Sequence, residues 1–259
     1  MSKVILDGAL PNAPVALVTG ASRGIGRAIC HTLARRGWDV CLTYLSNDAA
    51  AAETVALVEA QGRRALAVKS DSADAAQVRS LFAEIDRHFG RIDALVNNAG
   101  IVGGQHSILD LDVSLLRAVF DANVVGAFLC TQEAARRMSK QRGGSGGVVV
   151  NMSSAAARHG GLPMESHYAA SKGAIDSFTI ALGKELPAHG IRVNAVRPGL
   201  ILTDIHEAHG GQEMLARVGP TVPIGRAGEP QEVADVVAFL CSAESSYVHG
   251  ALIDVSGGR

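Results

Sequence analysis

The sequence predicts an α/β fold in which one doubly wound parallel sheet is covered by helices on both faces. Short apolar segments alternate with helical segments along most of the 259 residues, and this alternation is typical of parallel strands joined by helical crossovers. The strand segments are apolar throughout rather than at every second residue, as expected for strands buried on both faces. Right-handed crossovers then place a ligand site at the carboxyl ends of the strands.

The first unit is a strand, a glycine turn and a helix. The apolar run Pro14–Thr19 predicts a buried strand, Gly20–Gly26 a turn, and Arg27–Arg36 a helix. Glycines suit this turn because the backbone bends tightly and a pyrophosphate can approach the helix N-terminus. The spacing Gly-x-x-x-Gly-x-Gly departs from the Gly-x-Gly-x-x-Gly dinucleotide fingerprint, but the strand and helix around it match that motif.

The rest of the chain continues the alternation. Further strands are predicted at the apolar runs Asp39–Tyr44, Arg64–Lys69, Asp93–Val96, Gly147–Met152, Ile191–Val196 and Ala251–Asp254. Helices are predicted over residues 48–61, 74–89 and 112–139, in the segment that carries Tyr168, and from Glu229 onward. Because no repeat or long linker interrupts this rhythm, we expect residues 1–259 to form one domain, with residues 1–13 as an N-terminal extension.

Composition excludes several classes of function. The net charge of −1 and the pI near 6.8 leave no basic excess that would attract nucleic acid or an anionic membrane. No apolar run reaches the ~18 residues of a membrane span, and the N-terminus lacks a signal-peptide core. The four cysteines are widely spaced and are expected to be buried thiols in a reducing compartment. We therefore expect a cytoplasmic protein without nucleic-acid or membrane partners.

Polar residues follow three of the predicted strands. Asn97–Gly100, Ser153–Ser154 and Arg197–Gly199 each stand at a strand end, so they converge on one edge of a parallel sheet. Tyr168 and Lys172 lie four residues apart in a helical segment and therefore share a helix face. An ammonium group beside a phenol lowers the pKa of the phenol, which predicts that Tyr168 acts as a general acid and base.

These motifs together resemble the short-chain dehydrogenase/reductase family, from about Val15 to Arg259. The resemblance is carried, in chain order, by Thr19-Gly-x-x-x-Gly-Ile-Gly26, Asn97-Asn-Ala-Gly100, Asn123, Ser154, Tyr168-x-x-x-Lys172, Pro198-Gly199 and Asp254-Val-Ser-Gly-Gly258. It implies a Rossmann-type fold and an NAD(P)(H)-dependent oxidoreductase that interconverts an alcohol and a carbonyl by hydride transfer.

The resemblance also implies a catalytic tetrad. Tyr168 would exchange a proton with the substrate oxygen, and Ser154 would hydrogen-bond the same oxygen. Lys172 would bind the ribose of the nicotinamide nucleotide and lower the pKa of Tyr168. Asn123 would hold a water that links Lys172 to solvent; the alternative is a structural amide at a helix kink. Ser153 fits the family pattern only slightly less well than Ser154.

The glycine turn and the resemblance together predict the cofactor contacts. They are Gly20, Ser22, Arg23, Gly24, Ile25, Gly26, Tyr44, Asp71, Ser72, Asn98, Ala99, Gly100, Tyr168, Lys172, Pro198, Gly199, Ile201 and Thr203. NAD specificity usually shows as an acid at the end of the second strand, but Thr43-Tyr44-Leu45-Ser46 holds none before Asp48. Arg23 could pair with a 2′-phosphate, so NADP(H) is favoured over NAD(H).

The segment 200–228 resembles the family's mobile substrate lid, and Gly210 and Gly211 would ease its movement. His206 and His209 in this segment lack a third ligand at usable spacing, so no metal site is expected. The substrate is expected to be a small carbonyl or alcohol: a sugar, a hydroxy-ester, an acyl thioester or a small ketone. The family resemblance further implies a homotetramer.

Two alternatives remain open. Gly20-Ala-Ser22-Arg-Gly24 also fits the nucleophile elbow of serine hydrolases, although no acid and histidine pair stands out later in the chain. The second alternative is a non-catalytic NADP-binding sensor, which would have no need of the complete tetrad.

Overall fold

A parallel sheet organises the part of the chain that the computed structural model describes, residues 13–203 and 217–259. Within these residues the sheet has seven strands in the order β3-β2-β1-β4-β5-β6-β7. The strands are β1 (Val15–Val18), β2 (Asp39–Tyr44), β3 (Ala65–Lys69), β4 (Ala94–Asn97), β5 (Gly147–Met152), β6 (Ile191–Pro198) and β7 (Leu252–Val255). Residues 1–12 of the expected extension lie outside the described residues, as do His206, His209, Gly210 and Gly211 of the expected lid.

The strand order reverses between β1 and β4. β1 pairs in parallel with β2 on one side and with β4 on the other, so the chain returns to the middle of the sheet after β3. Loops that leave the carboxyl ends of β1 and β4 run in opposite directions and open a crevice between them. The predicted doubly wound sheet is thereby confirmed, and its switch point lies beside the glycine turn.

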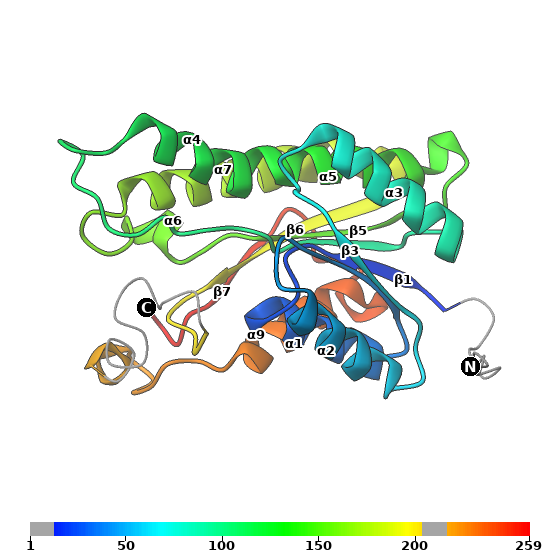
Figure 1. Ribbon diagram of the computed structural model, residues 1–259, viewed down its shortest axis with the longest axis horizontal. Helices are drawn as coiled ribbons and strands as arrows, with labels where there is room; N and C mark the ends of the chain where they lie inside the picture. The colour runs from blue at the N-terminus through cyan, green and yellow to red at the C-terminus, as the bar shows by residue number, and fades with distance from the viewer. Residues whose placement is uncertain (1–12, 204–216) are drawn as a thin grey trace.

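Helices cover both faces of the sheet, as Figure 1 shows. One face carries α1 (Gly24–Arg35), α2 (Asp48–Glu59) and α9 (Pro230–Cys241), and the other carries α3 (Ala75–Phe89), α4 (Val113–Phe120), α5 (Gly126–Met138) and α7 (Ser166–Glu185). Each layer encloses its own apolar core. Alternate residues of one strand belong to different cores: Val18 packs with Ile29 and Val237, whereas Leu17 packs with Phe82 and Ile175.

Several element boundaries differ from the sequence prediction. Helix α1 begins at Gly24 rather than Arg27, because the N–H of Arg27 already donates to the carbonyl oxygen of Arg23 at 3.2 Å and so closes a helical turn over the second and third glycines. Strand β6 continues to Pro198, two residues beyond the predicted end. Short helical turns that the sequence analysis did not predict are η2 (Lys140–Arg142), α6 (Ala156–His159), η3 (Leu186–His189), η5 (Gly219–Thr221) and η6 (Ala243–Ser245).

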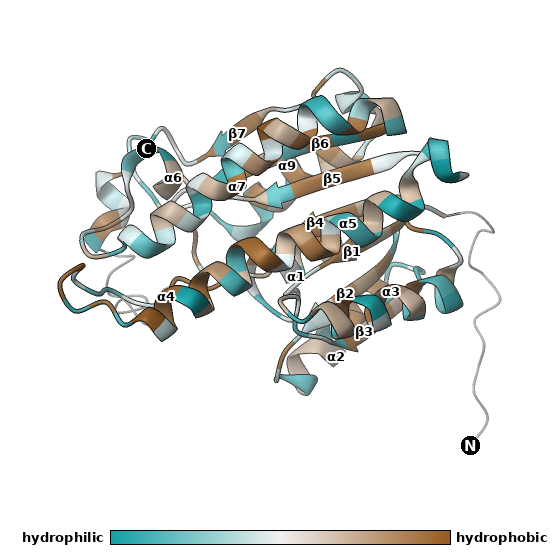
Figure 2. Ribbon diagram, turned by 90° about the horizontal axis from the view of Figure 1, so that it is seen from above, coloured by the Kyte–Doolittle hydropathy of each residue, from teal (hydrophilic) through white to brown (hydrophobic). Residues whose placement is uncertain are grey.

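The predicted helix over 112–139 is interrupted by a π-helical turn. This turn, η1 (Asp121–Val125), separates α4 from α5 and contains Asn123. The whole stretch Val113–Met138 is long and apolar enough to cross a membrane by length and composition alone. In the structure it packs on α3 and α7 within the helical layer (Figure 2). One such helix is weak evidence for a membrane span.

Candidate active site

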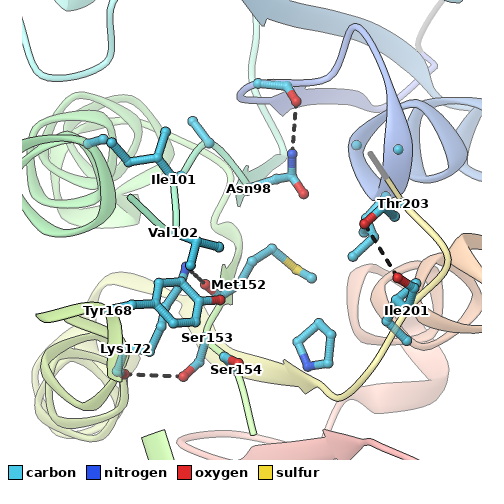
Figure 3. A pocket seen from close by; sticks show the side chains of 18 of the residues that line it. Asn98, Ile101, Val102, Met152, Ser153, Ser154, Tyr168, Lys172, Ile201 and Thr203 are labelled. Carbon is cyan, nitrogen blue, oxygen red and sulfur yellow. Dashed lines mark hydrogen bonds between the residues drawn. The ribbon is translucent and has the colours of Figure 1, made fainter. Parts of the chain in front are cut away.

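A cavity of about 540 Å³ lies at the carboxyl edge of the sheet. Every residue that we predicted to bind the cofactor lies on its wall, and so do Ser154, Tyr168 and Lys172 of the expected tetrad. Asn123 does not line the cavity; it is 2% exposed and buried behind the wall. Figure 3 shows how side chains from the loop after β4, from β5 and the loop after it, from α7 and from the segment after β6 converge on this space.

The glycine turn forms a cradle that has no room for a side chain at Gly20 or Gly26. Gly20 has a φ of +62°, and a Cβ there would lie 2.8 Å from the Cα of Ala99. A Cβ on Gly26 would lie 2.6 Å from the side-chain nitrogen of Asn98. The turn therefore lies directly against the loop after β4, and the N-terminus of α1 opens into the cavity. This arrangement fits the pyrophosphate of a dinucleotide, which binds free N–H groups at a helix N-terminus.

Thr19 and Asn98 hydrogen-bond the glycine turn to the loop after β4. The Asn98 side chain donates hydrogen bonds to the carbonyl oxygens of Thr19 at 2.9 Å and Gly20 at 3.0 Å. The Thr19 hydroxyl accepts the backbone N–H groups of Asn98 and Ala99, both at 3.0 Å. Thr19 was absent from the predicted contacts. Its position directly after a buried strand could have indicated this role, because a hydroxyl at a strand end can hydrogen-bond the backbone N–H groups of the neighbouring loop.

At the end of β2, the Tyr44 hydroxyl is hydrogen-bonded to Asp48, and this bond raises the pKa of Tyr44. Tyr44 lines the cavity and Asp48 does not. Arg27 is held by the Ser22 carbonyl oxygen at 2.6 Å and by Glu53 at 3.0 Å. Arg23, directly before α1, also lies on the cavity wall.

Tyr168 and Lys172 project from α7 toward Ser154, which follows β5 (Figure 3). The Tyr168 phenol shares a hydrogen bond with the Ser154 side chain. The Ser154 hydroxyl is fixed in turn by the backbone N–H of Ala156, at 3.1 Å. Ser153 points elsewhere, since its hydroxyl donates to the carbonyl oxygen of Lys172 at 3.2 Å. Both serines line the cavity, but of the two it is Ser154 whose side chain acts on the Tyr168 phenol.

The ammonium group of Lys172 lies behind the Tyr168 ring. Its Nζ donates to the carbonyl oxygen of Met152 at 2.8 Å and stands 5.8 Å from the centroid of the ring. Burial lowers the pKa of Lys172 to about 8, and the charge of Asp176 acts in the opposite direction. A buried ammonium group thus sits beside the phenol, as the four-residue spacing predicted.

The pKa of Tyr168 does not follow the sequence expectation. Burial raises this pKa above its ordinary value, the hydrogen bond from Ser154 lowers it, and the charge of Glu165 raises it. We expected Lys172 to be the dominant influence and to lower the pKa. The difference arises because Lys172 directs its ammonium group to the Met152 carbonyl oxygen rather than to the phenol oxygen.

Asn123 connects three segments around the tetrad. Its amide nitrogen donates to the Ile101 carbonyl oxygen and to the Ser171 hydroxyl, both at 2.9 Å, and its oxygen accepts the Ile101 N–H at 2.7 Å. A Cβ on Gly100 would lie 2.8 Å from this oxygen and 3.5 Å from the Nζ of Lys172. The π turn brings the amide to this point, and π turns frequently occur at functional sites.

Asp176 and Arg197 form an ion pair that our sequence analysis did not anticipate. Asp176 lies one helical turn after Lys172 and accepts the Arg197 guanidinium at 2.7 Å and 3.0 Å. Arg197 immediately precedes Pro198 and Gly199 on the cavity wall. The pair therefore joins the end of β6 to α7. The four-residue spacing from Lys172 was the signal that could have found Asp176.

Replacing Asp176 by asparagine is expected to lower the pKa of Lys172 further, because the charge that raises it is removed. The ammonium form is then lost at lower pH, so the alkaline fall in kcat should begin at lower pH than in the wild-type protein. Breaking the buried pair with Arg197 should also destabilise the fold, by about 3–5 kcal/mol. The measurements are kcat between pH 6 and 10 and a thermal melt. Glu185→Gln, at the exposed end of α7, is the control, and an unchanged alkaline limb in Asp176→Asn would contradict the prediction.

Comparison with known proteins agrees with this geometry. A family model described as Enoyl-(Acyl carrier protein) reductase matches residues 20–259. A crystal structure of a short-chain type dehydrogenase/reductase from Mycobacterium marinum superimposes with a TM-score of 0.89 at 35% identity, over 98% of both chains. The chain belongs to the short-chain dehydrogenase/reductase family. It is an oxidoreductase of that family, as the resemblance of its motifs implied.

Two curated relatives match nearly the whole chain. The Uncharacterized oxidoreductase YgfF of Escherichia coli (strain K12) is 44% identical over 245 residues, which cover 95% of this chain and 99% of the relative. The L-rhamnose 1-dehydrogenase (NAD(P)(+)) of Sphingomonas sp. (strain SKA58) is 41% identical over 247 residues, with 93% and 94% covered. Both are oxidoreductases, and the second uses either nicotinamide dinucleotide according to its name.

Proposed function

We propose that this protein interconverts an alcohol and a carbonyl with NADP(H), and that Tyr168 is its general acid and base. The observation that carries the proposal is that Tyr168, Ser154 and Lys172 stand together on the wall of the cavity that the glycine turn also lines. A nicotinamide dinucleotide, when bound, supplies or accepts the hydride at the C4 atom of its nicotinamide ring. The protein's own groups handle the proton.

In the reductive direction, Tyr168 donates a proton to the substrate oxygen while Ser154 donates a hydrogen bond to it. Two donors aimed at one oxygen stabilise the negative charge that develops there. Lys172 holds the ribose hydroxyls of the cofactor, and Asn123 holds a water that leads from Lys172 to solvent. Because burial raises the pKa of Tyr168, the phenol is protonated near pH 7 and is ready to act as an acid.

The preference for NADP(H) rests on Arg23 and Tyr44. No acidic side chain follows β2 on the cavity wall, because Asp48 is hydrogen-bonded to Tyr44 and does not reach the cavity. The cavity thus offers no carboxylate at the place where NAD-specific proteins bind the ribose 2′-hydroxyl. The guanidinium of Arg23 can instead pair with the 2′-phosphate of NADP(H).

Replacing Arg23 by alanine is expected to raise the KM for NADPH by about 10–100-fold, the effect of losing one charge-assisted contact to phosphate. The KM for NADH should change by less than about threefold, since NADH carries no 2′-phosphate. Initial rates with each cofactor at a saturating carbonyl substrate measure both values. Arg35→Ala, at the last turn of α1 and away from the cavity, is the matched control. Equal changes for the two cofactors would remove the argument for NADP(H).

We further propose a cytoplasmic homotetramer and one domain spanning residues 1–259. Apolar side chains are exposed on the helical layer: Val113 is 59% exposed, Val125 40%, Phe128 49% and Ile180 43%. The Phe128 ring stacks on Phe178 of α7 at 3.7 Å between centroids, which ties this face together. An exposed apolar face of this kind suits an interface between subunits. Light scattering of the purified protein measures the mass.

Residues 200–228 are proposed to act as a lid over the substrate. Leu200, Ile201, Thr203 and Val218, which flank residues 204–216, line the cavity. A segment anchored at both ends on the cavity wall can cover a bound substrate and exclude water from the reacting atoms.

The direct test is oxidation of NADPH by a panel of carbonyl compounds, followed by absorbance of the nicotinamide, with Tyr168→Phe as the inactive control. Tight NADPH binding without turnover on a broad panel would favour the sensor alternative. The hydrolase alternative is not supported, because the hydrogen bonds that the structure gives Ser22 run to its carbonyl oxygen from Arg27 and Thr54, and family membership accounts for the glycine turn.

A further inference from the structure

His167 is a buried imidazole that directly precedes Tyr168 in the first turn of α7. It is 2% exposed, and its Nε2 lies 3.1 Å from the carbonyl oxygen of Val102. Because a carbonyl oxygen only accepts hydrogen bonds, we assign the proton of the neutral ring to Nε2, which leaves Nδ1 without one. Nδ1 is also buried, and it has no hydrogen-bond partner among the residues that the structure describes. The tetrad and the cofactor contacts make no use of His167.

A histidine at this place lowers the stability of the fold. The loop after β4 passes close to the ring: a Cβ on Gly103 would lie 3.3 Å from Nε2 of His167 and 2.8 Å from Cγ2 of Val119 in α4. A buried nitrogen without a hydrogen bond costs free energy, and a leucine or a phenylalanine would fill the space without that cost. The advantage of His167 must therefore lie in the hydrogen bond that it donates to Val102.

Val102 forms part of the cavity wall in a loop that is anchored on both sides of it. Ile101 and Val102 both line the cavity (Figure 3), and Val102 is 8% exposed. Before Val102, the side chain of Asn123 binds both backbone groups of Ile101, at 2.7 Å and 2.9 Å. After it, the N–H of His106 donates to the carbonyl oxygen of Met164 at 2.8 Å. Losing the hydrogen bond from the imidazole should therefore release Val102 without unfolding the loop.

We propose that His167 is a positioning residue, which acts through Val102 to set the apolar wall on which the carbon chain of the substrate packs. His167 and Tyr168 are neighbours in α7, so one turn of helix holds both the proton donor and the residue that fixes this wall. A substrate that packs on a fixed Val102 brings its carbonyl oxygen to the phenol in one geometry, and a displacement of about 1 Å from such a geometry lowers rates strongly. The proposal rests on the oxidoreductase function proposed above.

Two amide substitutions separate the hydrogen bond from the volume of the ring. The amide nitrogen in His167→Gln reaches as far along the side chain as Nε2, so it can donate to the Val102 carbonyl oxygen. The amide nitrogen in His167→Asn ends where Nδ1 lies, so it cannot.

The rates are measured with NADPH and with butan-2-one, hexan-2-one and octan-2-one. We expect kcat/KM for the best of these ketones to fall by about 10–100-fold in His167→Asn and in His167→Leu. In His167→Gln it should stay within about threefold of the wild-type value, and the dissociation constant of NADPH should change by less than about twofold in all three variants. His31→Leu, in α1 on the other face of the sheet and away from the cavity, is the control.

A double-mutant cycle tests whether the effect passes through Val102. In Val102→Ala the side chain that the hydrogen bond positions is shortened, so adding His167→Leu should lower kcat/KM by less than about threefold more. A histidine that only supports the fold would lower kcat/KM by the same factor with and without Val102→Ala, and it would lower the melting temperature.

Crystal structures of the wild-type protein, His167→Leu and His167→Gln measure the position of Val102 itself. Val102 should be displaced in His167→Leu and should keep its wild-type place in His167→Gln.

Three results would overturn the proposal: an unmoved Val102 in His167→Leu, equal kcat/KM in His167→Gln and His167→Asn, and additive losses in the double-mutant cycle. If the wild-type protein binds NADPH but reduces neither these ketones nor a broad carbonyl panel, the proposed function fails. The crystal structures then still decide whether His167 positions Val102.

Discussion

Replacing Tyr168 by phenylalanine is expected to lower kcat by about 10²–10⁴-fold, the usual contribution of a general acid or base. The substitution removes one oxygen atom and leaves the ring that packs over Lys172. The affinity for NADPH should therefore change little, and the fold should be retained. Steady-state rates of carbonyl reduction give kcat, and quenching or enhancement of NADPH fluorescence gives the dissociation constant.

Two comparisons make the Tyr168→Phe result specific. Ser154→Ala should lose less activity than Tyr168→Phe, because Ser154 contributes a hydrogen bond to the substrate oxygen but no proton. Ser153→Ala is the matched control, since its hydroxyl bonds to the backbone of α7. Near-normal turnover in Tyr168→Phe would exclude the phenol as the proton donor. It would also remove the mechanism proposed for this cavity.

Replacing Lys172 by methionine is expected to lower kcat/KM by about 100-fold or more, since a preorganised charge at the reaction centre is lost. The same change should make the protein more stable at pH 7. Burial lowers the pKa of Lys172 from 10.5 to about 8, and this difference corresponds to about 3 kcal/mol of destabilisation by the charged form. Losing the hydrogen bond to the Met152 carbonyl oxygen offsets about 1 kcal/mol of that gain.

The sign of the pH dependence follows from the direction of this pKa. Below pH 8 the lysine is charged in both the folded and the unfolded protein, so the full cost of burying the charge is present. Between about pH 8 and 10.5 the unfolded chain binds more protons than the folded protein, so stability rises with pH. The advantage of Lys172→Met should therefore be largest at pH 7 and should shrink toward pH 10.

Thermal melts of the wild-type protein and Lys172→Met at pH 7 and pH 10 measure this advantage. A gain of about 2 kcal/mol should raise the melting temperature at pH 7 by several degrees. Lys184→Met, near the exposed end of α7, should change stability little at either pH. A Lys172→Met protein that is less stable than the wild type at pH 7 would mean that the ammonium group stabilises the fold through its contacts more than its burial costs.

Much of the fold could be predicted from local patterns. Apolar strands such as Val15–Val18 and Asp39–Tyr44 are buried on both faces, so their composition alone distinguishes them from the amphipathic helices between them. The glycine turn could also be predicted from the sequence, because only a residue without a side chain fits where Gly20 meets Ala99. The four-residue spacing of Tyr168 and Lys172 placed both groups on one face of α7.

Other features depend on contacts between distant segments. The π turn that interrupts the predicted helix over 112–139 could not be predicted from the sequence. It holds Asn123, whose side chain bonds to Ile101 and Ser171 in segments that are distant in the chain. The pairing of Asp176 with Arg197 joins a helix to a strand end 21 residues away in the chain. The burial of Glu165 and the hydrogen bond of its carboxylate to the Leu162 N–H were not predictable, because they depend on how the loop at Gly161 and Leu162 folds against it.

Sequence by itself determined the doubly wound sheet, the position of the ligand site and the group of residues that surround it, because periodicity and strand-end chemistry are local properties. Only the tertiary structure decided how the site is charged: Tyr168 has a raised pKa and Lys172 a lowered one. The physical reason is that a pKa depends on desolvation and on the distances to other charges, and both are set by segments that meet only when the chain is folded.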